Sequence, residues 1–140
     1  MRIDVQRRGL ACGVLEAIDS ESVLLRLPHT DYRLQLRPTV PTDELAGLLG
    51  KRVRGTIEAV AQKIHPAAGG GGFIEPIEGE PRIVAGTVLM ADEEARRVLI
   101  DAAIPVWLTA QEGQDFGAIR SGGLVNCYVL SGARFTPQGV

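Results

Sequence analysis

Cysteine is scarce in this sequence. Its 140 residues include only Cys12 and Cys127, and neither belongs to a Cys-x-x-Cys pair. Disulfide scaffolds and cysteine-based zinc sites need more cysteines at short spacing, so both are excluded. We interpret Cys12 and Cys127 as buried free thiols without a redox role, and we expect no metal and no cofactor.

Long apolar runs are also absent. The first eight residues, Met1 to Arg8, lack the apolar segment of a signal peptide. No run approaches the about 18 apolar residues that cross a membrane as a helix. These absences predict a soluble, cytoplasmic protein of bacterial type that makes no contact with a membrane.

The chain has no strong excess of positive charge. Its net charge is −2 and its pI is near 5.7, whereas proteins that coat nucleic acids through bulk electrostatics are strongly basic. The halves differ, because residues 1–70 carry ten Lys/Arg and eight Asp/Glu, a net +2, while residues 71–140 carry five and nine, a net −4. A polyanion would therefore meet the first half of the chain.

Patterns typical of catalysis are missing as well. His29 and His65 each lie next to a proline, but no serine or cysteine nucleophile motif accompanies them and no residues have metal-ligand spacing. The acidic segments 19–21 and 92–94 are typical of solvated turns. The glycines at 69–72 lack the Gly-Lys-Ser/Thr ending of a phosphate-binding loop. We therefore expect that the protein is not an enzyme.

The most informative feature that is present is an internal repeat. The stretch 50–66 is echoed by 122–137: Val53 aligns with Val125 at an offset of 72 residues (125 − 53), and further apolar positions follow the same offset. Earlier segments match at offsets of 73 to 75, with the changes confined to turns. A chain that is 45% hydrophobic can bury a core, but units as small as its halves are marginal alone. We expect the halves to pack on each other or on a second chain.

Hydrophobic periodicity predicts mostly strands. Residues 32–37 alternate strictly, with Tyr32, Leu34 and Leu36 facing inward. A two-turn helix is predicted over 42–50, with Thr42 as its N-cap, and residues 111–120 are predicted to form a poor helix or a loop. The remaining predicted strands are 3–5, 10–18, 23–27, a strand of about thirteen residues after Gly50 with a bend near Gly55 or Ala59, 73–77, 82–90, 98–100, 106–109 and 122–130.

The order of these elements resembles a known fold. Three strands, a short helix and a strand opening Gly-x-x-Val-x-Gly-x-Ile at 50–57 resemble the oligonucleotide/oligosaccharide-binding (OB) fold, whose helix lies between its third and fourth strands. Residues 45–57 look like the passage from that helix to the fourth strand. The resemblance implies an all-β protein with one or two short helices, built as two tandem OB-like small β-barrels at 1–66 and 81–140. A Gly-rich linker at 67–80, which can hold a short edge strand, joins them.

Each OB-like unit needs a fifth strand, and the chain offers few candidates. Residues 73–77 could complete the first unit. For the second unit three sources are open: residues 2–5, a closing strand that bends and serves twice, or an edge donated by a neighbouring chain. We favour completion within one chain.

The outward-facing residues carry the functional prediction. In the second repeat, alternation places Trp107, Tyr128 and Leu130 outward where the first repeat has charges, and such an exposed apolar set marks a contact surface. We therefore predict a non-catalytic binding or assembly module that contacts a protein partner or self-associates through the second repeat. A shift of the alternation by one residue would instead place Trp107 in the core.

The alternative function is binding of single-stranded nucleic acid. Proteins that bind single strands combine a basic groove with stacking aromatic side chains. The first repeat has outward basic residues without an aromatic neighbour, and aromatic residues make up only 4% of the chain. The candidate residues are Arg33, Arg37, Lys51, Arg52, Arg54 and Lys63.

Overall fold

The protein is mostly β, as the sequence predicts. The computed structural model describes residues 9–138, which form strands joined by short connections and two 3-10 turns. No helix in this part of the chain has the length and hydropathy needed to cross a membrane. The elements in chain order are β1 (Ala11–Ile18), β2 (Val23–Arg26), β3 (Arg33–Pro38), η1 (Thr42–Glu44), η2 (Ala46–Leu48), β4 (Arg52–Ala67), β5 (Phe73–Glu75), β6 (Glu78–Gly79), β7 (Ile83–Asp92), β8 (Arg97–Asp101), β9 (Pro105–Ala110), β10 (Leu124–Val129) and β11 (Arg134–Pro137).

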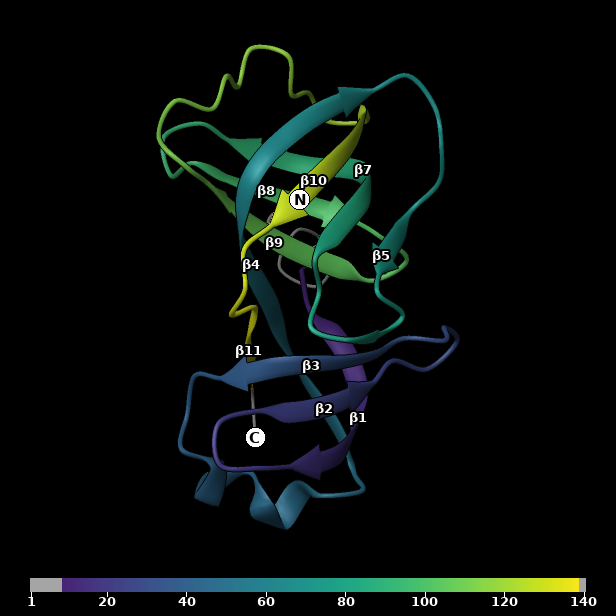
Figure 1. Cartoon of the computed structure of the whole chain (residues 1–140), viewed down its shortest axis with the longest axis vertical. Helices are drawn as coiled ribbons and strands as arrows, with labels where there is room; N and C mark the ends of the chain where they lie inside the picture. The colour runs from purple at the N-terminus through teal and green to yellow at the C-terminus, as the bar shows by residue number, and fades with distance from the viewer. Residues whose placement is uncertain (1–8, 139–140) are drawn as a thin grey trace.

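The first three strands belong to a closed circuit of pairings. Going round it, β1 pairs with β2, β2 with β3, β3 with β11, β11 with β4, and β4 with β1. All of these pairs are antiparallel except β3 with β11, which is parallel. We call this set the N-terminal circuit. It occupies the lower part of Figure 1, and one of its strands, β11, comes from the far end of the described chain.

A second closed circuit lies above the first in Figure 1. Here β7 pairs with β8, β8 with β9, β9 with β4, β4 with β10, and β10 with β7. Again a single pair is parallel, β9 with β4, and the others are antiparallel. We call this set the C-terminal circuit. Strand β4 therefore belongs to both circuits, and its 16 residues suffice because each circuit uses a different half.

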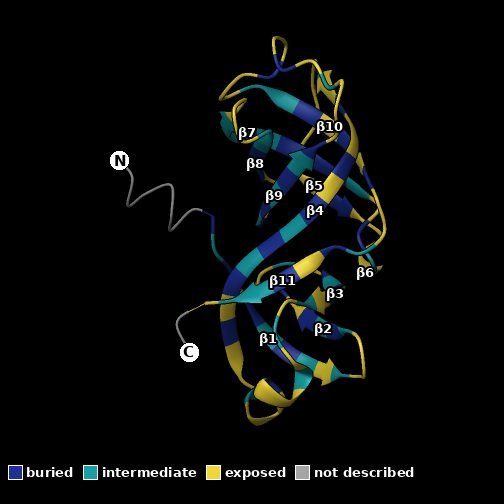
Figure 2. Ribbon diagram, turned by 90° about the vertical axis from the view of Figure 1, so that its left-hand side faces the viewer, coloured by how far each residue is buried: buried dark blue, intermediate teal, exposed yellow. Residues whose placement is uncertain are grey.

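The two circuits meet along a spine made of β4 paired with β11 and then β10. One side of β4 pairs with β11 over 55–58 and with β10 over 61–67, while the other side pairs with β1 over 52–55 and with β9 over 58–61. The alternation of β4 up to Ala61, and the buried Ile64 after the irregularity at 62–63, supply inward side chains to both circuits, which makes this double use feasible. Figure 2 shows these buried and exposed bands along β4 as it rises from one circuit to the other.

One connected core fills both circuits. Its largest fully buried side chain is Phe135 of β11, which is 1% exposed and closes the N-terminal circuit. Two glycines let backbones cross closely: a Cβ at Gly55 would lie 2.1 Å from the Thr136 carbonyl oxygen, and one at Gly86 would lie 2.0 Å from the Asp101 carbonyl oxygen. Only glycine fits such close approaches.

The helix predictions need correction. Residues 42–50 form the short 3-10 turns η1 and η2 instead of a two-turn α-helix, and the N-cap position of η1 is Pro41, with no side-chain capping bond from Thr42. Gly47 and the turn after Leu45 leave too few consecutive helix-forming residues to extend a helix. Residues 111–120 form turns and loop, the second of the two predicted outcomes, and Gly113 there adopts a φ of 92° that an α-helix cannot contain.

The source of the fifth strands differs from the prediction. The N-terminal circuit is completed by β11, and the C-terminal circuit by the far half of β4. Strand β5, within the predicted strand 73–77, pairs with β7 instead of completing the first unit. The predicted strand 3–5 and the proposed completing segment 2–5 lie outside the described residues. Sequence periodicity located β4 and β5, but it did not identify 134–137 as a strand, and it could not reveal which strand each would pair with.

The predicted division into 1–66, 67–80 and 81–140 remains a prediction. Pairings cross its boundaries in four places: β11 pairs with β3 and β4, β4 pairs with β9 and β10, β6 pairs with β3, and β5 pairs with β7. Each half of the chain thus donates a strand to the circuit formed mainly by the other half.

Candidate functional site

The outer face of the spine carries an apolar patch formed by Val60, Tyr128 and Leu130. Their side chains are 38%, 54% and 37% exposed, and they are half of the large hydrophobic residues left exposed between residues 9 and 138. The Leu130 N–H donates to the Val60 carbonyl at 2.9 Å, so the two residues are neighbours across the spine. We call these three residues the ribbon patch. A group of exposed apolar side chains on neighbouring strands is typical of a contact surface.

The polar residues beside the ribbon patch come from β4 and β11. The ring of His65 packs edge-on against Tyr128, with the ring centroids 6.2 Å apart, and Lys63 pairs in register with Tyr128. On the other flank, Glu58 lies 3.7 Å from Arg134 of β11. The patch is therefore an apolar centre with charged residues of both signs around it, the arrangement of a protein-contact surface.

Trp107 faces outward from β9 but is not fully open to solvent. Its neighbours Val106 and Leu108 are buried in the core while the indole is half-buried, so the alternation holds without a one-residue shift. The Arg97 guanidinium lies 4.2 Å from the centroid of the indole ring, and the indole N–H donates to the Gly9 carbonyl at 3.3 Å. Trp107 pairs in register with Glu58 of β4, two residues before the ribbon patch, so it lies at the margin of that patch.

The six basic candidates do not form one continuous surface. Arg33 and Arg37 lie on β3, Lys63 lies on the far half of β4, and Lys51, Arg52 and Arg54 lie around the start of β4. In the N-terminal circuit, β11 separates β3 from β4 on one side and β1 and β2 separate them on the other. Within the described residues, the cluster 51–54 forms no ion pair and is exposed on its three basic side chains.

Arg33 is already neutralised within the protein. Its guanidinium lies 3.1 Å from a carboxylate oxygen of Glu16 and 2.7 Å from one of Glu78. The hydrogen bond from Arg33 lowers the pKa of Glu16, with smaller Coulomb contributions from Arg33 and Arg26. The two carboxylates in turn raise the pKa of Arg33 further. A phosphate at this position would have to displace a carboxylate, which weakens the case for Arg33 as a phosphate contact.

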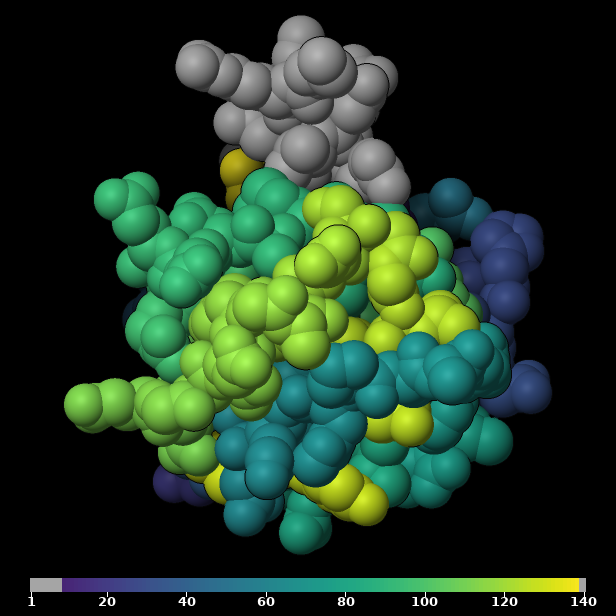
Figure 3. All heavy atoms as spheres, turned by 90° about the horizontal axis from the view of Figure 1, so that it is seen from above, coloured from purple at the N-terminus to yellow at the C-terminus, as the bar shows by residue number. Residues whose placement is uncertain are grey.

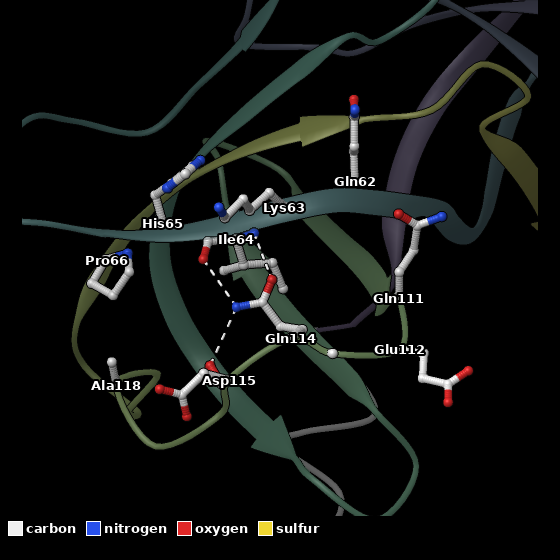
Figure 4. A pocket seen from close by; sticks show the side chains of 11 residues that line it. Gln62, Lys63, Ile64, His65, Pro66, Gln111, Glu112, Gln114, Asp115 and Ala118 are labelled. Carbon is white, nitrogen blue, oxygen red and sulfur yellow. Dashed lines mark hydrogen bonds between the residues drawn. The ribbon is translucent and has the colours of Figure 1, made fainter.

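A cleft of about 440 Å³, lined by polar and apolar groups, lies between the far half of β4 and the loop 111–118, which are side by side when the molecule is seen from above (Figure 3). The Gln114 side chain crosses it (Figure 4): the Ile64 N–H donates to Gln114 Oε1 at 2.9 Å, and Gln114 Nε2 donates to the Ile64 carbonyl at 3.1 Å. This amide takes the place of a strand where β9 ends. The cleft carries both signs of charge, from Lys63 on one side and from Glu112 and Asp115 on the other.

The remaining acidic and thiol side chains considered as functional candidates do not gather into a site. Asp19 accepts hydrogen bonds from the backbone N–H groups of Glu21 and Ser22, and these bonds lower its pKa. Burial raises the pKa of the Cys127 thiol to about 12. Cys12 is exposed, so the prediction that both thiols are buried is wrong for Cys12, which occupies an outward position of β1. Residues 9–138 contain no group of three or more His, Cys, Asp or Glu able to hold a metal ion.

The sequence analysis did not identify Val60 as part of the apolar patch. Alternation along β4 places it outward, and a large apolar residue at an outward position was the available signal. What alternation could not show is that β10 lies next to β4, which brings Val60 beside Leu130.

A comparison with protein-family models, curated proteins and solved structures found no match for this chain.

Proposed function

We propose that this protein is a non-catalytic binding or assembly module that contacts a protein surface, in the first instance a second copy of itself, through the ribbon patch. The observation that carries the proposal is the gathering of Val60, Tyr128 and Leu130 on the outer face of the spine. Charged residues of both signs surround this apolar centre, so the surface can complement itself about a two-fold axis, the commonest symmetry of homo-oligomers. Trp107 would lie at the rim of the contact.

The contact should be weak in isolation. Three half-exposed side chains supply only part of the roughly 800 Å² per partner found in standard interfaces. Most other apolar side chains are buried in the core, so these three side chains supply most of the exposed apolar surface of the spine. We expect association at tens to hundreds of micromolar protein, within the reach of transient assemblies.

We also propose that the two circuits are OB-like small barrels related by duplication. They have the same strand order, and their single parallel pair occurs at the same place. The repeat offsets agree with the pairing. Arg37 pairs with Arg134 in the N-terminal circuit. An offset of 74 takes residue 37 to residue 111, and an offset of 72 takes residue 134 back to residue 62. Residues 62 and 111 directly follow Ala61 and Ala110, which pair in the C-terminal circuit. Each half of this chain would then complete the barrel of the other.

Single-strand nucleic-acid binding is the competing proposal. It is supported by the exposed cluster Lys51, Arg52 and Arg54, which lacks ion pairs within the described residues. Titration with mixed single-stranded DNA and RNA at two salt concentrations tests it, because phosphate contacts weaken steeply as salt rises. Binding that is lost in the variant with all three residues changed to Ser would favour this function over assembly.

Sedimentation velocity tests the assembly proposal. We expect the sedimentation coefficient of the wild type to rise between roughly 20 µM and 1 mM protein, and the double variant Tyr128→Ser, Leu130→Ser to remain a monomer throughout, because the apolar centre is removed. Leu49→Ser is the matched control, since Leu49 is at least as exposed as Leu130 but follows η2, outside the ribbon patch. A wild type that stays monomeric, or a double variant that associates as the wild type does, would rule out self-association through this patch.

A further inference from the structure

An apolar depression lies away from the ribbon patch, where the two circuits approach each other. Its volume is about 400 Å³, which is within the range of small-molecule sites. We call it the Phe73 cleft. It is lined by residues 29–32 of the β2–β3 turn, by Phe73, Ile74 and Glu75 of β5, by Ile77, and by Ala103 of the β8–β9 turn.

The walls of the Phe73 cleft are fixed by hydrogen bonds across the two circuits. The Tyr32 hydroxyl donates to the Ala102 carbonyl at 3.2 Å and accepts from the Ile74 N–H at 2.9 Å. The Thr30 hydroxyl donates to the Leu27 carbonyl at 2.6 Å and accepts from the Tyr32 N–H at 3.0 Å. These bonds tie the β2–β3 turn, β5 and the β8–β9 turn together. A cleft that is already formed loses little conformational freedom when a ligand enters it.

The floor of the cleft is apolar. Phe73 and Ile77 are 37% and 53% exposed, so folding leaves a large part of both side chains in contact with water at this place. The buried side chains of Tyr32 and Ile74 continue the same surface inward. An apolar body resting here would cover Phe73 and Ile77 and would present its edge to the aromatic ring of Phe73.

The charged residues of the cleft are mostly acidic. Asp31 and Glu75 line it, both are exposed, and neither takes part in an ion pair among the described residues. Glu78, close by in the sequence, is by contrast held by Arg33. No lysine or arginine lines the cleft, and its other titratable side chains are His29 and the hydrogen-bonded Tyr32. The cleft therefore complements a cation, and the excess of acidic residues in the second half of the chain acts in the same direction.

We propose that the Phe73 cleft binds an amphipathic organic cation: a ligand with an apolar or aromatic body and an ammonium group. The body lies against Phe73 and Ile77, and the ammonium group lies near the carboxylates of Asp31 and Glu75. This site is separate from the ribbon patch and does not depend on the protein being an assembly module. The charge decides between ligands of equal apolar area, since the same body with a carboxylate would be repelled by Asp31 and Glu75.

Nuclear magnetic resonance of the amide groups tests this site, with tryptamine as the probe and indole-3-acetate as the charge-reversed control. We expect tryptamine to shift the amide signals of residues 29–32, 73–77 and 103 and to saturate in the millimolar range, as a ligand of about a dozen heavy atoms should. Indole-3-acetate has the same ring system, and we expect it to leave these signals unchanged at equal concentration.

Variants separate the contribution of charge from that of apolar area. The double variant Asp31→Asn, Glu75→Gln should weaken tryptamine binding roughly threefold to tenfold, the range of two exposed ion pairs. Glu44→Gln, which changes an exposed carboxylate of η1 outside the cleft, should leave it unchanged. The amide spectrum itself reports whether each variant is folded. Equal shifts with indole-3-acetate, unchanged affinity in the double variant, or no shifts at the cleft up to roughly 10 mM tryptamine would each overturn the proposal.

Discussion

Replacing Phe135 by alanine should destabilise the whole protein, although this residue belongs to a strand of only four residues. Phe135 is 1% exposed and lies inside the N-terminal circuit, where β11 pairs with β3 on one side and β4 on the other. Truncation of a fully buried phenylalanine costs about 3–5 kcal/mol, because the transferred surface is lost and a cavity remains. With a total stability of about 5–15 kcal/mol for a domain of this kind, the change should be readily measurable.

Urea unfolding followed by two probes is the assay. For a slope of about 2 kcal/mol/M, the midpoint should fall by about 1.5–2.5 M urea. The single tryptophan, Trp107, reports on the C-terminal circuit, while far-UV circular dichroism reports on all strands. Because the two circuits share β4, both probes should shift together.

Phe73→Ala is the matched control, since Phe73 is 37% exposed on the edge strand β5. Its truncation should cost about 1 kcal/mol or less, because little buried surface is lost. The reasoning is refuted if Phe135→Ala costs no more than Phe73→Ala. It is also refuted if the Trp107 transition of Phe135→Ala stays at the wild-type midpoint while the circular dichroism shifts.

Two further predictions concern a crossing of backbones and a carboxylate. Gly86→Ala should destabilise the protein by about 3 kcal/mol in thermal or urea unfolding, because the new Cβ would lie 2.0 Å from the Asp101 carbonyl oxygen. The control Gly47→Ala, whose Cβ meets nothing within 4 Å, should change the stability by less than about 1 kcal/mol. Equal effects would show that the backbone crossing at Gly86 relaxes freely. Glu80 accepts hydrogen bonds from the Ser131 hydroxyl and the Gly132 N–H, and these bonds lower its pKa. Its ionised form therefore stabilises the fold above the ordinary pKa of 4.5, and this contribution is lost as the pH falls through the lowered pKa. Glu80→Gln should therefore cost about 1 kcal/mol at pH 7, and the difference from the wild type in urea unfolding should shrink toward pH 3; a cost that is independent of pH would contradict this role.

The sequence predicted local structure well where one periodicity was unbroken. The alternation of Tyr32 to Arg37, and that of β4 from Arg52 to Gln62, placed the inward and outward side chains correctly, because a strand buried on one face must alternate. The short helix was overestimated, since capping residues and leucine spacing do not reveal that the segment ends after single 3-10 turns.

Strand partnership was beyond what the sequence could predict. Nothing local to Arg134–Pro137 indicates that this segment pairs with β3, nearly a hundred residues earlier in the chain, because pairing depends on how the circuits close. The same limit applies to both candidate sites. The ribbon patch joins Val60 to Leu130, and the Phe73 cleft joins Tyr32 to Ala103, through contacts between distant segments.

The shared spine joins the two circuits and carries the ribbon patch, and native-state hydrogen exchange tests it most directly. If β4 serves both circuits, the slowest amides of β2 and β3 and those of β8 and β9 can be exposed only by one common opening. They should then exchange with the same opening free energy and the same dependence on denaturant. Two separate opening free energies, one for each circuit, would contradict a shared spine.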